Sequence, residues 1–182
     1  MTPVFALWVT GLPASGKSTI TRAVVRELAA RGVNVAVLES DALRRVLTPH
    51  PTYSEQERET FYGSMAYIGA LLVTHGVPVI FDATANRRAY REAARRAIER
   101  FVEVQVDCPL DVCVARDPKG IYGHAQEGQA STVPGVQTPY EPPEHPDAVV
   151  SGNADAADAV RAILQLLEGK GYISHQGASA TP

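Results

Sequence analysis

The stretch Gly11-Leu12-Pro13-Ala14-Ser15-Gly16-Lys17-Ser18-Thr19 matches the pattern G-x-x-x-x-G-K-[ST] of a phosphate-binding loop. It stands between an apolar run, residues 4–10, and a segment with the periodicity of a helix. Glycines let the backbone curl so that successive N–H groups point at phosphate oxygens, and the helix N-terminus adds the positive end of its dipole. The stretch therefore predicts a nucleotide site between a buried strand and a helix.

Three side chains of this loop have distinct expected roles. Lys17 is expected to reach the β- and γ-phosphates of ATP, which makes it a candidate catalytic residue. Ser18 offers its hydroxyl to Mg²⁺, and Thr19 adds a hydroxyl near the α-phosphate. The alternative, an ordinary Gly/Ser-rich turn, is disfavoured by the flanking strand and helix patterns. The predicted ATP-binding residues are Gly11, Leu12, Pro13, Ala14, Ser15, Gly16, Lys17, Ser18 and Thr19.

Length and composition predict one domain. The chain has 182 residues, 45% of them hydrophobic and 20% charged, so we expect one domain over residues 1–170 and a disordered tail over 171–182. The formal net charge of −3 gives no basic excess for a nucleic-acid polymer or an anionic membrane. The first apolar run is too short to cross a bilayer, so we expect a cytoplasmic protein. Cys108 and Cys113 are expected to be buried, reduced thiols.

Apolar strand patterns and amphipathic helix patterns alternate about five times along the chain, which is typical of an α/β protein. We predict a three-layer P-loop NTPase fold whose parallel five-stranded sheet has the order 2-3-1-4-5. The expected strands span residues 4–10, 33–38, 79–82, 102–106 and 147–151. The expected helices span residues 20–31, a short segment capped by Ser40 or Asp41, and residues 54–75, 86–100, 110–116 and 154–167.

Two acidic residues follow expected strands at the edge where open α/β sheets bind ligands. Asp41 follows the second strand, where it is either a ligand-site acid or only a helix cap. Asp82 ends the third strand and resembles the Walker-B acid that holds Mg²⁺ through water, although apolar strands often end in Asp. Further along, residues 117–146 lose all periodicity, and a stretch this long is either disordered or a lid that excludes water.

Several segments together resemble one family. They are the loop, Asp41-Ala42-Leu43-Arg44, Arg58, Arg116-Asp117-Pro118-Lys119-Gly120-Ile121-Tyr122, and Thr138-Pro139-Tyr140-Glu141-Pro142-Pro143. From about residue 4 to residue 167 the chain resembles the adenylylsulfate kinases, which phosphorylate the 3′-hydroxyl of adenosine 5′-phosphosulfate. The resemblance implies a kinase of sulfate assimilation that uses ATP and Mg²⁺. It also implies a homodimer and a functional link to ATP sulfurylase.

The resemblance also implies roles for matching residues. Asp41 matches the carboxylate that orients the acceptor hydroxyl and helps to organise Mg²⁺, which makes it the second candidate catalytic residue. Arg44 and Arg58 match arginines that hold the phosphosulfate-bearing substrate, and Lys119, Gly120 and Tyr122 begin the lid. The candidate metal-binding residues are thus Ser18, Asp41 and Asp82, and the candidate acceptor-binding residues are Asp41, Arg44, Tyr53, Arg58, Phe61, Lys119, Gly120 and Tyr122.

The chain departs from the family pattern at three places. Phe61 stands where the family has a substrate-contacting asparagine, Ala85-Asn86 replaces a Ser-Pro, and Val133 replaces a phenylalanine that stacks on the substrate's adenine. Tyr53 or Phe61 would then supply the aromatic face, because any π-surface can stack a purine.

Two other functions stay open at this point. The first is a related kinase whose acceptor is another small alcohol, since Asp82-Ala83-Thr84 resembles the Asp-x-Thr of such enzymes. The second is a non-catalytic ATP-binding switch module, which would not obviously need Asp41 or a lid.

Overall fold

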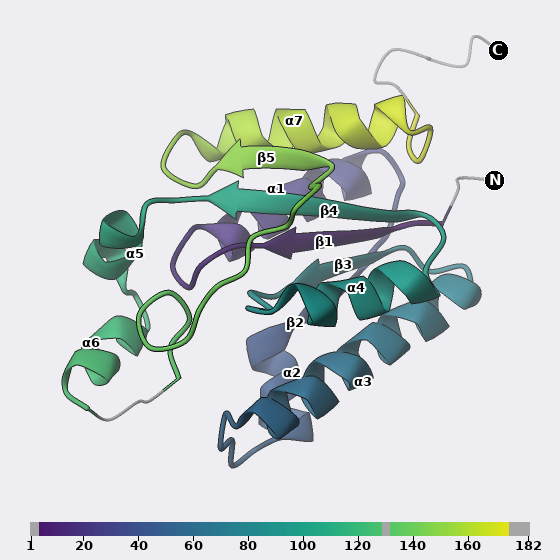
Figure 1. Ribbon diagram of the computed structural model, residues 1–182. Helices are drawn as coiled ribbons and strands as arrows, with labels where there is room; N and C mark the ends of the chain where they lie inside the picture. Colours follow the sequence, from purple (N-terminus) through teal and green to yellow (C-terminus); the bar gives the residue numbers. More distant parts are fainter. Residues whose placement is uncertain (1–3, 129–131, 175–182) are drawn as a thin grey trace, which may run out of the picture.

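The computed structural model describes residues 4–128 and 132–174, so part of the expected lid (129–131) and most of the expected tail (175–182) lie outside the described residues. Five parallel strands form one sheet with the order β2-β3-β1-β4-β5, which confirms the predicted order (Figure 1). The strands are β1 Ala6–Thr10, β2 Ala36–Glu39, β3 Val79–Asp82, β4 Phe101–Asp107 and β5 Ala148–Ser151.

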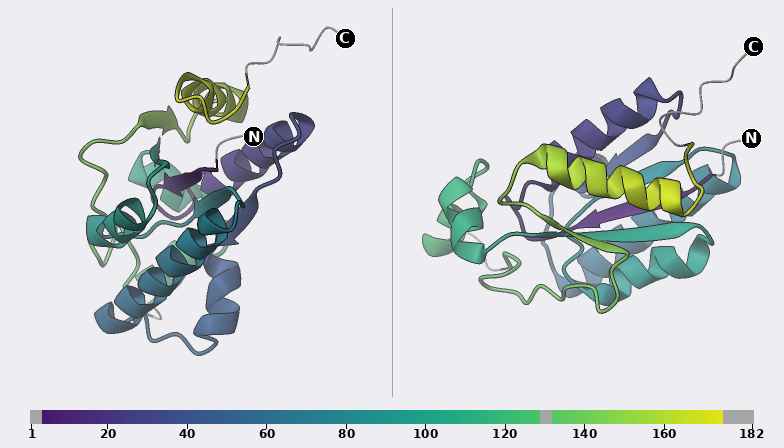
Figure 2. Two further views of the ribbon diagram at one scale, coloured as in Figure 1. Left: turned by 90° about the vertical axis from the view of Figure 1, so that its right-hand side faces the viewer. Right: turned by 90° about the horizontal axis from the view of Figure 1, so that it is seen from above.

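Helices cover both faces of the sheet, as the predicted three-layer fold requires (Figures 1 and 2). Helices α1 and α7 pack on one face, and α3 and α4 pack on the other. Two short helices, α5 and α6, lie beyond the carboxyl ends of the strands (Figure 1). The helices are α1 Lys17–Ala30, α2 Ser40–Leu47, α3 Glu55–Thr74, α4 Arg88–Ala97, α5 Leu110–Arg116, α6 Ile121–Gln126 and α7 Ala156–Gly169.

Alternate side chains of β1 join the two layers of the core. Leu7 and Val9 face α1 and α7, whereas Trp8 faces the α3 and α4 layer. The Trp8 ring stacks on Phe81 of β3 with centroids 4.5 Å apart, and its indole N–H donates to the Ala83 carbonyl at 3.1 Å. Burial on both faces explains why the strand appears as an uninterrupted apolar run.

Two predicted boundaries near β2 are wrong, for a local reason in each case. The strand begins at Ala36 and not at Val33, because the Val33 N–H donates to the Leu28 carbonyl at 2.9 Å and closes the C-terminus of α1. Ser40 and Asp41 do not cap α2, since both lie in its first turn and Glu39 is the N-cap without a side-chain bond. Asp41 is therefore free of a capping role.

Burial accounts for the two cysteines. Cys108 and Cys113 are both buried and neither is in a disulfide, which confirms the expected state of these thiols. Burial raises the pKa of the Cys113 thiol to about 12, so it stays protonated at neutral pH.

Within the described residues, no helix has the length and apolar character that a membrane span requires.

Two glycines of α3 provide a matched test of packing between this helix and the sheet. A Cβ at Gly69 would lie 2.1 Å from the Phe81 ring, which Trp8 holds in place, whereas a Cβ at Gly63 would meet nothing within 4 Å. We expect Gly69→Ala to lower the free energy of unfolding by about 1–2 kcal/mol because overpacking outweighs the gain in helix propensity. Gly63→Ala should raise it by about 0.5–1 kcal/mol. Urea unfolding of both variants measures this, and equal shifts would contradict the packing argument.

Candidate active site

A cleft of about 1010 Å³ opens at the carboxyl ends of the strands, where the sequence predicted the site. It is lined by the phosphate loop, the start of α2, the turn before α3 and the segment after α5. The predicted residues that line it are Pro13, Ala14, Gly16, Lys17, Ser18, Thr19, Asp41, Arg44, Tyr53, Arg58, Asp82 and Lys119. The predicted residues outside the lining are Gly11, Leu12, Ser15, Phe61, Gly120 and Tyr122.

The phosphate loop has the left-handed backbone that its glycines permit. Gly11 has φ 155° and Gly16 has φ 98°, and a Cβ at Gly11 would lie 2.6 Å from the Val106 carbonyl oxygen. Lys17, the first residue of α1, is only 8% exposed, and its Nζ donates to the carbonyls of Gly11 at 3.0 Å and Leu12 at 2.6 Å. The lysine is thus held inside the loop that would bind the phosphates.

Burial shifts the pKa values of two groups near the loop, Lys17 and Asp82. Desolvation lowers the pKa of Lys17 to about 8, although the nearby Asp82 carboxylate opposes this shift. Asp82, 5% exposed at the end of β3, has a raised pKa because burial outweighs its hydrogen bond from Ser18 and the charge of Lys17. A buried carboxylate beside the Ser18 hydroxyl offers the oxygen ligands that a divalent cation prefers.

Asp41 and Lys119 form an ion pair across the mouth of the cleft. Asp41 belongs to the first turn of α2, and Lys119 belongs to the segment that was expected to begin a lid. Their side chains are 49% and 56% exposed, so solvent screens the pair and little free energy is needed to separate them. Either group is therefore available to a ligand that enters the cleft.

Two arginines, Arg44 and Arg58, also line the cleft. The Arg44 guanidinium lies 3.9 Å from the centroid of the Phe61 ring, and its Nη1 is 3.2 Å from the Glu57 carboxylate. Phe61 is 2% exposed and packs in the core, so Arg44 covers the ring face that could otherwise stack on a ligand. Tyr53, with 41% exposure, presents an aromatic face to the cleft.

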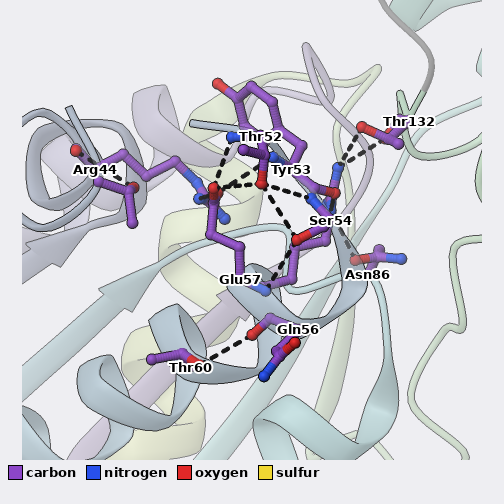
Figure 3. A network of polar contacts seen from close by, with 11 residues as sticks. Arg44, Thr52, Tyr53, Ser54, Gln56, Glu57, Thr60, Asn86 and Thr132 are labelled. Atoms are coloured by element: carbon purple, nitrogen blue, oxygen red, sulfur yellow. Dashed lines mark hydrogen bonds and ion pairs between the residues drawn. The ribbon is translucent and has the colours of Figure 1, made fainter. Parts of the chain in front are cut away.

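Arg58 is held by three different segments. Its Nε donates to the Tyr53 carbonyl at 3.1 Å, its Nη1 to Asn86 Oδ1 at 3.3 Å, and its Nη2 to the Thr132 carbonyl at 2.7 Å (Figure 3). The Asn86 amide in turn donates to the Pro139 carbonyl at 3.1 Å. Asn86 thereby connects Arg58 to the segment that returns from the expected lid, a contact that sequence reasoning missed.

The segment after α5 is tied to the phosphate loop. Asp117 Oδ2 accepts hydrogen bonds from the N–H groups of Tyr122 at 3.0 Å and Gly123 at 2.9 Å, which starts α6 after Gly120 at φ 65°. The Tyr122 hydroxyl donates to the Pro13 carbonyl at 3.0 Å. Tyr122 therefore packs behind the loop and does not line the cleft.

The turn after β5 is a further part of the site that the sequence reasoning missed. A Cβ at Gly152 would lie 2.0 Å from the Ser15 carbonyl oxygen, so only glycine fits beside the loop here. Arg116 donates to the Gly152 carbonyl at 2.7 Å and to Asn153 Oδ1 at 3.2 Å. The available signal was the Ser-Gly-Asn that ends the last strand, because such strand ends in α/β sheets adjoin the ligand.

The pKa of Lys17 predicts a pH dependence of ATP binding. Phosphate favours the charged amine, which is the dominant form in the free protein below pH 8 and a minor form above it. Affinity should therefore fall by about twofold between pH 7 and pH 8 and then by up to about tenfold per pH unit, with proton uptake on binding. Calorimetric titration from pH 7 to 9.5 tests this. Lys17→Ala should bind weakly with no such slope, and an equal slope in that variant would assign the titration to another group.

Comparisons with known proteins agree with this geometry. The family model for adenylylsulphate kinase matches residues 3–151. An adenylyl-sulfate kinase of Synechococcus sp. (strain JA-2-3B'a(2-13)) is 37% identical over 168 residues, which cover 92% of this chain and 96% of the relative. A probable bifunctional SAT/APS kinase 2 of Sorangium cellulosum is 35% identical over 176 residues, which cover 96% of this chain and 30% of the relative.

One solved structure resembles the whole described architecture. The structure of the Mycobacterium tuberculosis APS kinase CysC in complex with AMPPNP and APS superposes with a TM-score of 0.86 and 31% identity. The match covers 92% of this chain and 99% of the other chain. Because the family model matches most of its length, the chain belongs to the adenylylsulphate kinase family.

Proposed function

We propose that this chain transfers the γ-phosphoryl group of ATP to the 3′-hydroxyl of adenylyl sulfate. The observation that carries the proposal is one cleft that is lined by the phosphate loop and also by an acid and two arginines. The related M. tuberculosis enzyme was solved with an ATP analogue and APS, and it supports the same pair of ligands here.

The donor side neutralises and aligns the phosphates of ATP. Backbone N–H groups of residues 13–19 surround the phosphates, and Lys17 moves its bonds from the Gly11 and Leu12 carbonyls to the β- and γ-phosphates. Ser18 and Asp82, together with Asp41, would hold Mg²⁺. The ion, when bound, neutralises charge on the β- and γ-phosphate oxygens.

The acceptor side positions the hydroxyl and activates it. Arg44 and Arg58 bind the anionic phosphosulfate, and Tyr53 stacks on the adenine. Entry of the acceptor separates Asp41 from Lys119, after which the Asp41 carboxylate accepts the proton of the 3′-hydroxyl as its oxygen bonds to the γ-phosphorus and the bond to ADP breaks. The segment over residues 117–146 acts as the lid that excludes water.

Three wider expectations remain proposals. The Sorangium relative is described as a bifunctional SAT/APS kinase, which supports a functional link between this chain and ATP sulfurylase. A homodimer and a cytoplasmic location are proposed from family resemblance and from composition.

An acceptor screen tests the function directly. ADP release is coupled to a spectroscopic signal, and adenylyl sulfate is offered beside adenosine and common small alcohols. The proposal requires ADP release with adenylyl sulfate and formation of the 3′-phosphorylated product. Turnover with another alcohol alone would favour the related small-molecule kinase, and ATP binding without turnover of any acceptor would favour the switch module.

The Asp41→Asn variant tests whether the Asp41 carboxylate acts in phosphoryl transfer or only supports the fold. Because Asp41 makes no capping bond to α2, the neutral amide should leave the fold intact while the phosphoryl-transfer rate falls by about 10²–10⁴-fold. ATP affinity should change little, because the nucleotide is still bound through Gly11 to Ser18. Lost ATP binding together with lost turnover would instead assign Asp41 a role in Mg²⁺ binding or in folding. Single-turnover rates and nucleotide titration measure both quantities. Asp111→Asn, in the first turn of α5 and outside the cleft lining, is the matched control and should leave both unchanged.

A further inference from the structure

The carboxylate of Glu57 accepts hydrogen bonds from the turn that carries Tyr53 (Figure 3). Its Oε2 accepts hydrogen bonds from the Thr52 N–H at 2.6 Å and the Thr52 hydroxyl at 2.7 Å. Its Oε1 accepts from the Tyr53 N–H at 3.2 Å and from Arg44 Nη1 at 3.2 Å. The Glu57 side chain therefore contacts both the backbone of Tyr53 and the side chain of Arg44, one of the two acceptor-side arginines.

The backbone of Tyr53 needs such support. Tyr53 has φ 54°, a left-handed conformation that a bulky side chain rarely adopts unless its surroundings impose it. The Glu57 carboxylate binds the N–H of Tyr53, and Arg58 Nε binds its carbonyl, so the residue is held at both ends. Strain of this kind clusters at ligand sites, because it fixes a side chain in an orientation that a relaxed turn would not give.

The same carboxylate orients Arg44. The guanidinium carbon of Arg44 lies 3.9 Å from the Phe61 ring centroid and 5.1 Å from the Tyr53 ring centroid, so it is in contact with both rings. The ion pair with Glu57 fixes where the guanidinium lies along these faces. Glu57 thus determines the relative position of the ring and the charge that face the cleft.

A simple helix cap does not explain these contacts. Ser54 is the N-cap of α3 and accepts from the Glu57 N–H at 3.3 Å, which is half of a capping box. In a complete box the Glu57 side chain would return to the Ser54 N–H, but that N–H donates to the Thr52 hydroxyl at 3.3 Å. The Glu57 side chain instead reaches past the cap to Thr52 and Tyr53.

We propose that Glu57 is a positioning residue that sets the affinity for the acceptor by holding Tyr53 and Arg44 in one arrangement. The proposal rests on the proposed function, since it concerns the binding of adenylyl sulfate. All four groups that contact the carboxylate are donors, so an acceptor-only side chain is required. Although desolvation opposes it, the bonds from Thr52 and Tyr53 lower the pKa of Glu57, which keeps the carboxylate ionised.

Glu57→Gln separates positioning from capping. Glutamine serves in a capping box as well as glutamate does, but its NH₂ group would face a backbone N–H of Thr52 or of Tyr53 in either orientation. We expect the KM for adenylyl sulfate to rise by about tenfold or more, with the KM for ATP and the kcat at saturating acceptor within about twofold of the wild type. Glu59→Gln, an exposed glutamate of the same helix, should match the wild type.

Two further variants complete the experiment. Thr52→Val removes the hydroxyl that donates to Glu57 and that also contacts Ser54, but it keeps the bond from the Thr52 N–H to Glu57. It should raise the same KM to a smaller extent, and it decides the matter if Glu57→Gln does not fold. In a Tyr53→Ala background, Glu57→Gln should raise the KM for adenylyl sulfate by a smaller factor than it does alone, because the ring that Glu57 positions is absent.

The outcomes are distinct. An unchanged KM for adenylyl sulfate in a folded Glu57→Gln variant overturns the positioning role, and so does an equal rise in the KM values for both substrates. Either result leaves the proposed function standing. Failure of the wild-type chain to phosphorylate adenylyl sulfate overturns the proposed function, and the positioning role falls with it. A selective rise in the acceptor KM, absent in Glu59→Gln, supports the proposal.

Discussion

Close backbone contact between the phosphate loop and the ends of β4 and β5 is the constraint on which the rest of the site depends. A Cβ at Gly11 would lie 2.6 Å from the Val106 carbonyl oxygen, and a Cβ at Gly152 would lie 2.0 Å from the Ser15 carbonyl oxygen. Because neither position has room for a side chain, the loop lies directly against the end of β4 and the turn after β5. Its N–H groups are thereby fixed by backbone packing before any nucleotide binds, which reduces the free-energy cost of ordering them.

The acceptor side is organised by side chains instead. Within the described residues, the contacts of Arg58 with Tyr53, Asn86 and Thr132 make four hydrogen bonds, whereas a guanidinium has five N–H donors. These contacts orient the arginine and still leave capacity for an anion. Asp41 and Lys119, which are exposed and paired, can separate readily. The cleft thus combines a phosphate loop held by backbone packing with an exposed ion pair, Asp41 and Lys119, that can exchange partners.

Sequence periodicity and one motif were enough to predict the parallel strands and the position of the loop, because buried parallel strands and a phosphate loop both have strong local patterns. The strand order was predicted from the order expected of a protein with a kinase-type loop, and the structure confirms it. The early start predicted for β2 overlooked a local signal, because Gly32 at φ 76° lets the Val33 N–H bind the Leu28 carbonyl and close α1. Local patterns could not show that Phe61 lies beneath Arg44, or that Asn86 binds Arg58. Such contacts join residues far apart in the chain, and only the packing of α3 against the sheet determines them.

Two of the three departures from the family pattern lie against the two acceptor-side arginines. Phe61, in place of the family asparagine, supplies the ring beneath Arg44, and Asn86, in place of the family proline, supplies the oxygen that binds Arg58. A proline at position 86 could offer neither that side-chain oxygen nor the amide that binds the Pro139 carbonyl. The two changes therefore alter the support of the arginines while keeping the arginines themselves.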